Sequence, residues 1–194
     1  MTWVFGYGSL MWRPGFAHRL RHPATLPGWR RAFCRLSFRH RGTETAPGMV
    51  VGLERGGVCR GYAYLVEPDQ EAQVLEYLDA REGAGYRRGQ LPLEIDGGDG
   101  RFQDTAWVYV PEEDHPSYAP GLPRERIVEL IATGRGQSGT AHNYLVALIG
   151  ELERLNLSDP AMHALLASVE AYKRKHGAVP RPLKAGDEAR RAIP

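Results

Sequence analysis

The sequence predicts an α+β protein built on a small mixed sheet. Short segments rich in aromatic and β-branched residues occupy the first half of the 194-residue chain, and segments with helical hydrophobic spacing occupy the second half. No internal repeat is present. Strands that come first and helices that come later are typical of α+β folds. We expect the sheet to close into a small barrel with flanking helices.

The expected strands are separated by turn signals. A Pro-Gly pair at residues 27–28 and a glycine-rich run at 96–100 indicate turns, and the Gly-Gly pair at 56–57 predicts a hairpin. An amphipathic segment at residues 68–82 interrupts the series as a helix. The strands are expected at residues 2–7, 29–37, 48–54, 58–66, 90–95 and 105–110.

The second half of the chain is expected to be helical. Leu145, Leu148 and Leu152 recur at the spacing that places side chains on one face of a helix. Ser158 is a typical N-cap residue, and Pro160 suits the first turn of the helix that follows. The expected helices cover residues 124–133, 140–156 and 160–175.

Length and composition favour one domain without a nucleic-acid or membrane partner. Hydrophobic residues make up 42% and charged residues 25% of the chain, and the net charge of +2 is too small to indicate nucleic-acid binding. No apolar run approaches the roughly 18 residues that a membrane span needs, and no signal peptide precedes Trp3, so we expect a cytoplasmic protein. We assign residues 1–176 to the domain and residues 177–194, rich in proline and charge, to a C-terminal tail.

Cysteine, histidine and serine give no catalytic or metal motif. Cys34 and Cys59 are too few for a disulfide framework and lack metal-site spacing, so we expect buried thiols. The seven histidines are scattered, and no pair has metalloenzyme spacing. Ser9 lacks a nucleophile elbow, which disfavours a Ser-His-Asp hydrolase. The sequence therefore indicates no metal site.

Two basic segments, residues 29–31 and 35–41, allow two interpretations. Charges of this kind commonly cover solvated strand edges. A binding site for an anionic small molecule would require the same residues. Composition alone does not decide between them.

The sequence FGYGSL at residues 5–10 is a candidate binding loop. Two glycines after an expected strand let the backbone turn sharply and approach a ligand closely. Successive N–H groups in such a turn can form a nest for an anion. A glycine-containing bulge or turn without a ligand is the alternative. No third glycine follows at dinucleotide-binding spacing.

A second glycine pattern, GRGQSG at residues 134–139, satisfies G-x-G-x-x-G. A dinucleotide fingerprint follows a strand within a βαβ unit, whereas this segment follows an expected helix. We therefore do not assign nucleotide binding to it. We expect it to end one helix and to open the next, with Ser138 or Thr140 as the N-cap.

Glu82 is the candidate acid–base. Helical periodicity places it between Leu75 and Leu78, on the face that should be buried. It also lies at the helix C-terminus, where the helix dipole disfavours an anion. A glutamate that departs from two local preferences is a candidate functional residue, and burial raises a carboxyl pKa toward the range useful for proton transfer. The alternative is a helix that ends one residue earlier, with Glu82 turned outward.

Five blocks of sequence over residues 3–173 can be read together. They are VFGYGSLMW at 4–12, RHRG with the following PG and VV at 39–51, GYAY at 61–64, the segment YLDAREGAGY at 77–86, and the segment 136–145 with SG and NYL. In these blocks and in their order, the chain resembles the ChaC family of γ-glutamylcyclotransferases. One such block would be weak evidence, whereas five in order are strong evidence.

The resemblance implies the γ-glutamylcyclotransferase fold, a small mixed β-barrel with flanking helices. It implies cleavage of glutathione to 5-oxoproline and cysteinylglycine, without a metal or organic cofactor. Glu82 would be the acid–base, and Tyr144 matches a family tyrosine near the site. Arg39 or Arg41 would pair with the glycine carboxylate of glutathione. The residues that would bind the γ-glutamyl group are Gly6, Tyr7, Gly8, Ser9, Leu10 and Met11.

Two alternative functions remain at this point. One is a cyclotransferase of the same fold that acts on other γ-glutamyl amino acids or amines. The other is a non-catalytic binding or regulatory protein linked to cation transport. A pure binding protein would not need Glu82, so its presence favours an enzyme. The sequence leaves the oligomeric state open.

Overall fold

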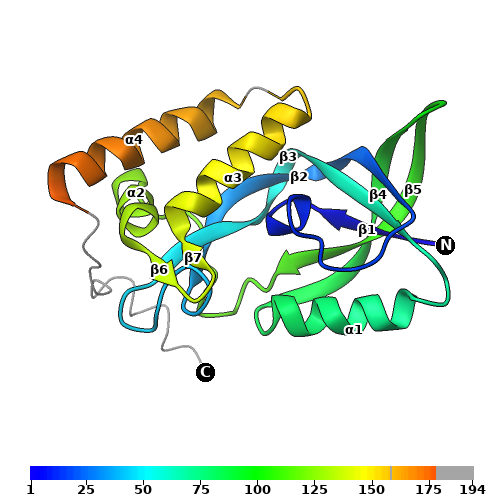
Figure 1. The fold of residues 1–194 in the computed structure, drawn as a ribbon, viewed down its shortest axis with the longest axis horizontal. Coiled ribbons are helices and arrows are strands. Elements are labelled where there is room, and N and C mark those ends of the chain that lie inside the picture. The colour runs from blue at the N-terminus through cyan, green and yellow to red at the C-terminus, as the bar shows by residue number, and fades with distance from the viewer. Residues whose placement is uncertain (158, 178–194) are drawn as a thin grey trace. The chain divides into compact units, whose positions relative to one another are not determined.

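The computed structural model describes residues 1–157 and 159–177 of the chain (Figure 1). As far as it is described, the chain forms two compact units, each built from two separate segments. Unit 1 consists of Met1–Arg31 and Leu53–Glu112, and unit 2 consists of Ala32–Gly52 and the described residues from Glu113 onward. The single domain predicted for residues 1–176 stays a prediction, and all of the predicted tail at 177–194 except Gly177 lies outside the described residues.

The main sheet is a closed barrel (Figure 1). Its strands are β1 (Thr2–Gly6), β2 (Leu20–Ser37), β3 (Gly48–Val66), β4 (Tyr86–Gly97) and β5 (Gly100–Pro111). Their order around the barrel is β1-β3-β2-β4-β5. Because β1 pairs antiparallel with β3 and parallel with β5, the barrel is mixed. The prediction of an α+β fold with a small mixed barrel is confirmed.

The prediction of a hairpin at Gly56 and Gly57 is wrong. β3 runs through both glycines, which have φ angles of 89° and 78°. β2 likewise runs through Gly28, with a φ of 77°, and begins at Leu20 instead of residue 29. A side chain added at Gly28 or Gly56 would meet no atom within 4 Å. Glycine at positive φ can therefore bend these strands without reversing them.

Helix α1 (Glu71–Glu82) packs against the barrel strands of unit 1. Val74 and Leu78, four residues apart, lie on the same face of the helix and are buried. They belong to a hydrophobic cluster with Val4 of β1 and Val66 of β3. The predicted helix at 68–82 is confirmed, with its start moved to Glu71. This packing fixes the C-terminal end of α1, which carries Glu82.

Unit 2 contains the remaining helices, α2 (Arg124–Thr133), α3 (Ala141–Arg154) and α4 (Pro160–His176). A short hairpin, β6 (Arg135–Gly136) and β7 (Gly139–Thr140), connects α2 to α3. Thr140 caps α3, as predicted, by accepting a hydrogen bond from the Asn143 N–H at 3.0 Å. The N-cap of α4 is Asp159 instead of the predicted Ser158, which lies outside the described residues.

Two further sequence predictions concern burial and membranes. Cys34 and Cys59 are buried and neither takes part in a disulfide, as predicted. Burial raises the pKa of the Cys59 thiol, which keeps it protonated. Within residues 1–157 and 159–177, no helix has the length and hydrophobicity that a membrane crossing requires.

Candidate active site

The predicted site residues divide between the two units. Gly6 to Met11 and Glu82 belong to unit 1, whereas Arg39, Arg41 and Tyr144 belong to unit 2.

The candidate binding loop begins where β1 ends. Ser9 opens a short 3₁₀ helix, η1 (Ser9–Met11), which Gly8 precedes as N-cap. The first N–H groups of a helix have no acceptor inside it, so the start of η1 offers donors to an anion. Gly6 is required by close packing, because a Cβ at this position would lie 2.9 Å from the Cβ of Leu10.

Side chains hold the carbonyl groups of this loop in place. The hydroxyl of Tyr64 donates to the Leu10 carbonyl at 2.7 Å, and Arg31 Nε donates to the Tyr7 carbonyl at 2.7 Å. The Tyr7 hydroxyl in turn donates to the Tyr109 carbonyl at 2.7 Å. These buried or half-buried bonds make the loop a rigid element before any ligand binds. A rigid loop binds a ligand at a lower entropic cost than a mobile one.

Glu82 is the last residue of α1, and its side chain is 19% exposed. The helix does not end one residue earlier, and the carboxylate is not turned fully into solvent. Gly83, at a φ of 65°, ends the helix immediately after it. The structure therefore agrees better with the first of the two interpretations of this glutamate, because its side chain is partly buried at the C-terminal end of a helix. Its role in proton transfer stays a prediction.

Arg81 connects this end of α1 to the segment that follows β1. Its Nη1 donates to the carbonyl oxygens of Arg13 at 2.6 Å and Pro14 at 2.8 Å, and its Nη2 donates to Ser9 Oγ at 3.1 Å. Its Nε lies 3.9 Å from a carboxylate oxygen of Glu82. One guanidinium thus contacts Glu82 and the first residue of η1.

A second set of polar contacts ties the last turn of α1 to the barrel. Asp79 accepts hydrogen bonds from the Tyr109 hydroxyl at 2.6 Å and from Arg88 at 2.8 Å. Burial raises the pKa of Tyr109, and the hydrogen bond to Asp79 adds to the effect. The phenol therefore remains a donor at any physiological pH.

In unit 2, Arg41 and Tyr144 lie together. The guanidinium of Arg41 is 5.5 Å from the centre of the Tyr144 ring. Its Nη1 donates to the carbonyl oxygens of Ser138 at 2.6 Å and Thr140 at 3.3 Å. Arg41 therefore holds the β6–β7 hairpin.

Arg39 differs from Arg41 in its surroundings. Its carbonyl accepts a hydrogen bond from the Gln137 N–H at 2.9 Å, and the residue is exposed. Across the described part of the chain, no acceptor lies within hydrogen-bonding distance of its guanidinium. Of the two predicted arginines, Arg39 is the one whose charge is not used by the fold.

No metal ligands are grouped in the part of the chain that the structure describes. In that part, no three His, Cys, Asp or Glu side chains lie close enough together to hold a metal ion.

Comparison with known proteins decides the family. The model of the family described as ChaC-like protein matches residues 2–172. The chain belongs to the ChaC-like family. A glutathione-specific γ-glutamylcyclotransferase of Escherichia coli (strain K12) is 37% identical over 171 residues, which cover 87% of this chain and 73% of that protein. One of the same name from Schizosaccharomyces pombe is 31% identical and covers 88% of this chain and 92% of its own length.

A solved structure confirms the fold expected of a ChaC-like protein. The crystal structure of a γ-glutamylcyclotransferase specific to glutathione, from yeast, superposes with a TM-score of 0.84 at 24% sequence identity. The superposition covers 90% of this chain and 98% of the yeast chain. The predicted γ-glutamylcyclotransferase fold is therefore correct.

Arg81 of this ChaC-like protein is a candidate site residue that the sequence did not reveal. An arginine in the last turn of a helix is favoured by the helix dipole, so it departs from no local preference. The feature of the sequence that could have indicated Arg81 is its position between Asp79 and Glu82, in a block that resembles the family. Its partners Ser9, Arg13 and Pro14 are about seventy residues away, and no periodicity reveals contacts of that separation.

Proposed function

We propose that the protein is a glutathione-specific γ-glutamylcyclotransferase, which converts glutathione to 5-oxoproline and cysteinylglycine. The observation that carries the proposal is the position of Glu82, whose partly buried side chain is joined through Arg81 to the loop at Ser9. The relatives from E. coli and S. pombe bear the name of this activity. A pure binding protein would not need Glu82.

The reaction needs one proton carrier and a folded-back substrate. The α-amine of the γ-glutamyl group attacks its own γ-carbonyl carbon, and the new C–N bond closes a five-membered lactam. Holding the reacting atoms together gives such an intramolecular attack a high effective molarity. Glu82, as carboxylate, accepts a proton from the α-ammonium group. It then donates that proton to the cysteine nitrogen as the old C–N bond breaks.

The N-terminal loop supplies the electrostatic part of the mechanism. The N–H groups at the start of η1 would bind either the α-carboxylate of the substrate or the oxygen that becomes negative on the γ-carbonyl. Tyr64, Arg31 and Tyr7 hold the loop, so these donors need no reorganisation during the reaction. Tyr144 is proposed as a further contact to the substrate, and Gly6, Gly8 and Met11 shape the loop.

Incubation of the purified protein with glutathione in EDTA is expected to give 5-oxoproline and cysteinylglycine in equal amounts. The rate should match the rate without chelator, because proton transfer by Glu82 and positioning by the loop require no metal or organic cofactor. Chromatography of both products checks the result. Activity lost in EDTA and restored by a divalent ion would contradict the mechanism, and release of glutamate instead of 5-oxoproline would indicate a hydrolase.

Arg39→Gln is expected to raise the KM for glutathione by about tenfold with little change in kcat, the usual sign of a lost binding contact. The unused guanidinium of Arg39 suits a pair with the glycine carboxylate. γ-Glutamylcysteine, which lacks that glycine, should react more slowly than glutathione and be insensitive to the substitution. Steady-state kinetics with both substrates checks this, with Arg41→Gln for comparison. An unchanged KM in Arg39→Gln would show that Arg39 does not pair with the glycine carboxylate.

The same kinetics separates the alternative substrates. Equal kcat/KM for glutathione and for γ-glutamyl dipeptides or γ-glutamylamines would indicate a cyclotransferase of broader specificity. No turnover of any of them would favour the binding or regulatory protein linked to cation transport. We place the enzyme in the cytoplasm, where two thiols that form no disulfide persist, and assign it neither a nucleic-acid nor a membrane partner.

A further inference from the structure

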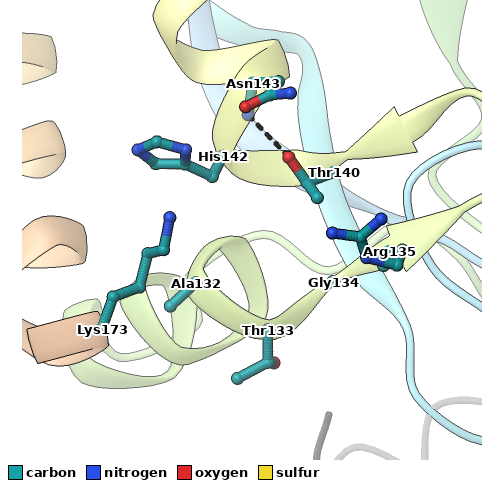
Figure 2. Close-up of a pocket in the computed structure, with 8 residues that line it drawn as sticks. All are labelled: Ala132, Thr133, Gly134, Arg135, Thr140, His142, Asn143 and Lys173. Carbon is teal, nitrogen blue, oxygen red and sulfur yellow. Dashed lines mark hydrogen bonds between the residues drawn. The ribbon is translucent and has the colours of Figure 1, made fainter. Parts of the chain in front are cut away.

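Unit 2 contains a cavity that the proposed reaction does not use. Its volume is about 370 Å³. It lies between the end of α2, the β6–β7 hairpin, the first turn of α3 and Lys173 of α4 (Figure 2). None of its side chains has been given a role in binding or cleaving glutathione.

The cavity is lined by basic side chains and by no acidic one. Figure 2 shows Lys173 extending from α4 toward His142, with Arg135 beside Thr140. Among the residues that the structure describes, neither Lys173 nor Arg135 has a carboxylate within 4 Å. Two positive charges therefore line the cavity, and no carboxylate of the described residues forms an ion pair with either of them.

The nearby carboxylate of Glu170 already has a hydrogen-bonding partner. It forms a hydrogen bond with His142 Nε2, which joins α3 to α4. That hydrogen bond lowers the pKa of Glu170, so the carboxylate remains charged beside the histidine. Glu170 is not among the residues that line the cavity. Glu170 therefore offsets part of the charge of Lys173 without contacting it, because the charge of Lys173 also lowers the pKa of Glu170, whereas the described residues give Arg135 no carboxylate partner.

The other lining groups suit an anion as well. Thr140 and Asn143 add a hydroxyl and an amide, and the start of α3 adds the partial positive charge of a helix N-terminus. Ala132 supplies the apolar side chain of the lining. A cavity with this composition is unsuited to an apolar ligand.

We propose that this cavity binds a small molecule that carries a phosphate group. A phosphate monoester has a charge of about −1.5 to −2 near neutral pH. It therefore balances the two cations of the lining better than a ligand with a single carboxylate would. The planar guanidinium of Arg135 can bind two phosphate oxygens at once, and Lys173 supplies a point charge. Cavities for small molecules commonly measure about 300–1,000 Å³, so this one has room for an organic part beyond the phosphate.

Calorimetry on the full chain tests the proposal, with inorganic phosphate and adenosine monophosphate as probes at matched ionic strength. The monoester is expected to bind saturably and more tightly than inorganic phosphate. Lys173→Gln and Arg135→Gln should each weaken binding by about tenfold, the scale of a lost charge-assisted hydrogen bond. Lys175→Gln is the matched control, because Lys175 is exposed, carries the same charge and lies on another face of α4.

Several outcomes would overturn the proposal. The absence of saturable binding for both probes would do so, as would unchanged affinity in the Lys173→Gln, Arg135→Gln double variant. Equal affinities for inorganic phosphate and the monoester would also overturn it, because the organic part of the ligand would then make no contact with the cavity. Glutathione turnover without phosphate should be normal in both single variants. A loss of turnover there would assign the two cations to the substrate site and overturn the proposal. The phosphate titrations need no glutathione turnover, so they test the cavity whether or not the proposed function holds.

Discussion

Glu82→Gln is expected to lower kcat for glutathione by about 100-fold or more, the usual scale for a lost general acid–base. The amide keeps the shape of the side chain but cannot accept the proton of the α-ammonium group. Glutathione should still bind, because Glu82 acts on protons and the loop at residues 6–11 holds the substrate. Single-turnover kinetics and calorimetry on the purified variant measure the two effects separately.

Glu76→Gln is the matched control for this experiment. Glu76 belongs to the same helix and is exposed, so its loss should change neither turnover nor binding. The unfolding temperature of both variants should stay close to that of the parent protein. If Glu82→Gln retained most of the parent's kcat, the carboxylate would have a structural role and the proposed mechanism would be wrong.

The barrel could be predicted because most of its signals are local. β1 and β5 are rich in aromatic and β-branched residues, and the turn between β4 and β5 lies in the glycine-rich run from Asp96 to Gly100. The Gly56-Gly57 pair was misinterpreted because positive φ serves a bend as well as a turn. The neighbouring strands decide whether the glycines form a bend within one strand or a turn between two. The pairing of those strands depends on residues far away in the sequence.

The candidate site shows the same division between local and distant information. Glu82 could be found because its burial and its place at a helix C-terminus depart from local preference. Arg39 and Arg41 could not be ranked from sequence. Their difference depends on the β6–β7 hairpin, whose carbonyl groups occupy Arg41. Strands of two residues leave no periodic pattern to predict.

Arg81→Ala is expected to lower kcat/KM for glutathione by up to about 100-fold, although the arginine is not assigned a proton in the reaction. Its guanidinium contacts Glu82 and donates to Ser9, Arg13 and Pro14, so its loss should let the helix end and the loop move apart. A misplacement of about 1 Å between reacting groups can cost that much. Steady-state kinetics measures the loss, and Arg19→Ala, at an exposed arginine of unit 1, is the control.

Two further measurements distinguish positioning by Arg81 from a general effect on folding. Arg81→Lys keeps the positive charge but loses the planar fork of donors, so it should stay folded and remain well below the parent in kcat/KM. Added guanidinium ion at millimolar concentration should restore part of the activity of Arg81→Ala and none of the activity of Glu82→Gln. Full activity in folded Arg81→Lys would show that charge alone suffices. Full activity in Arg81→Ala would show that the connection from α1 to Ser9 does not contribute to catalysis.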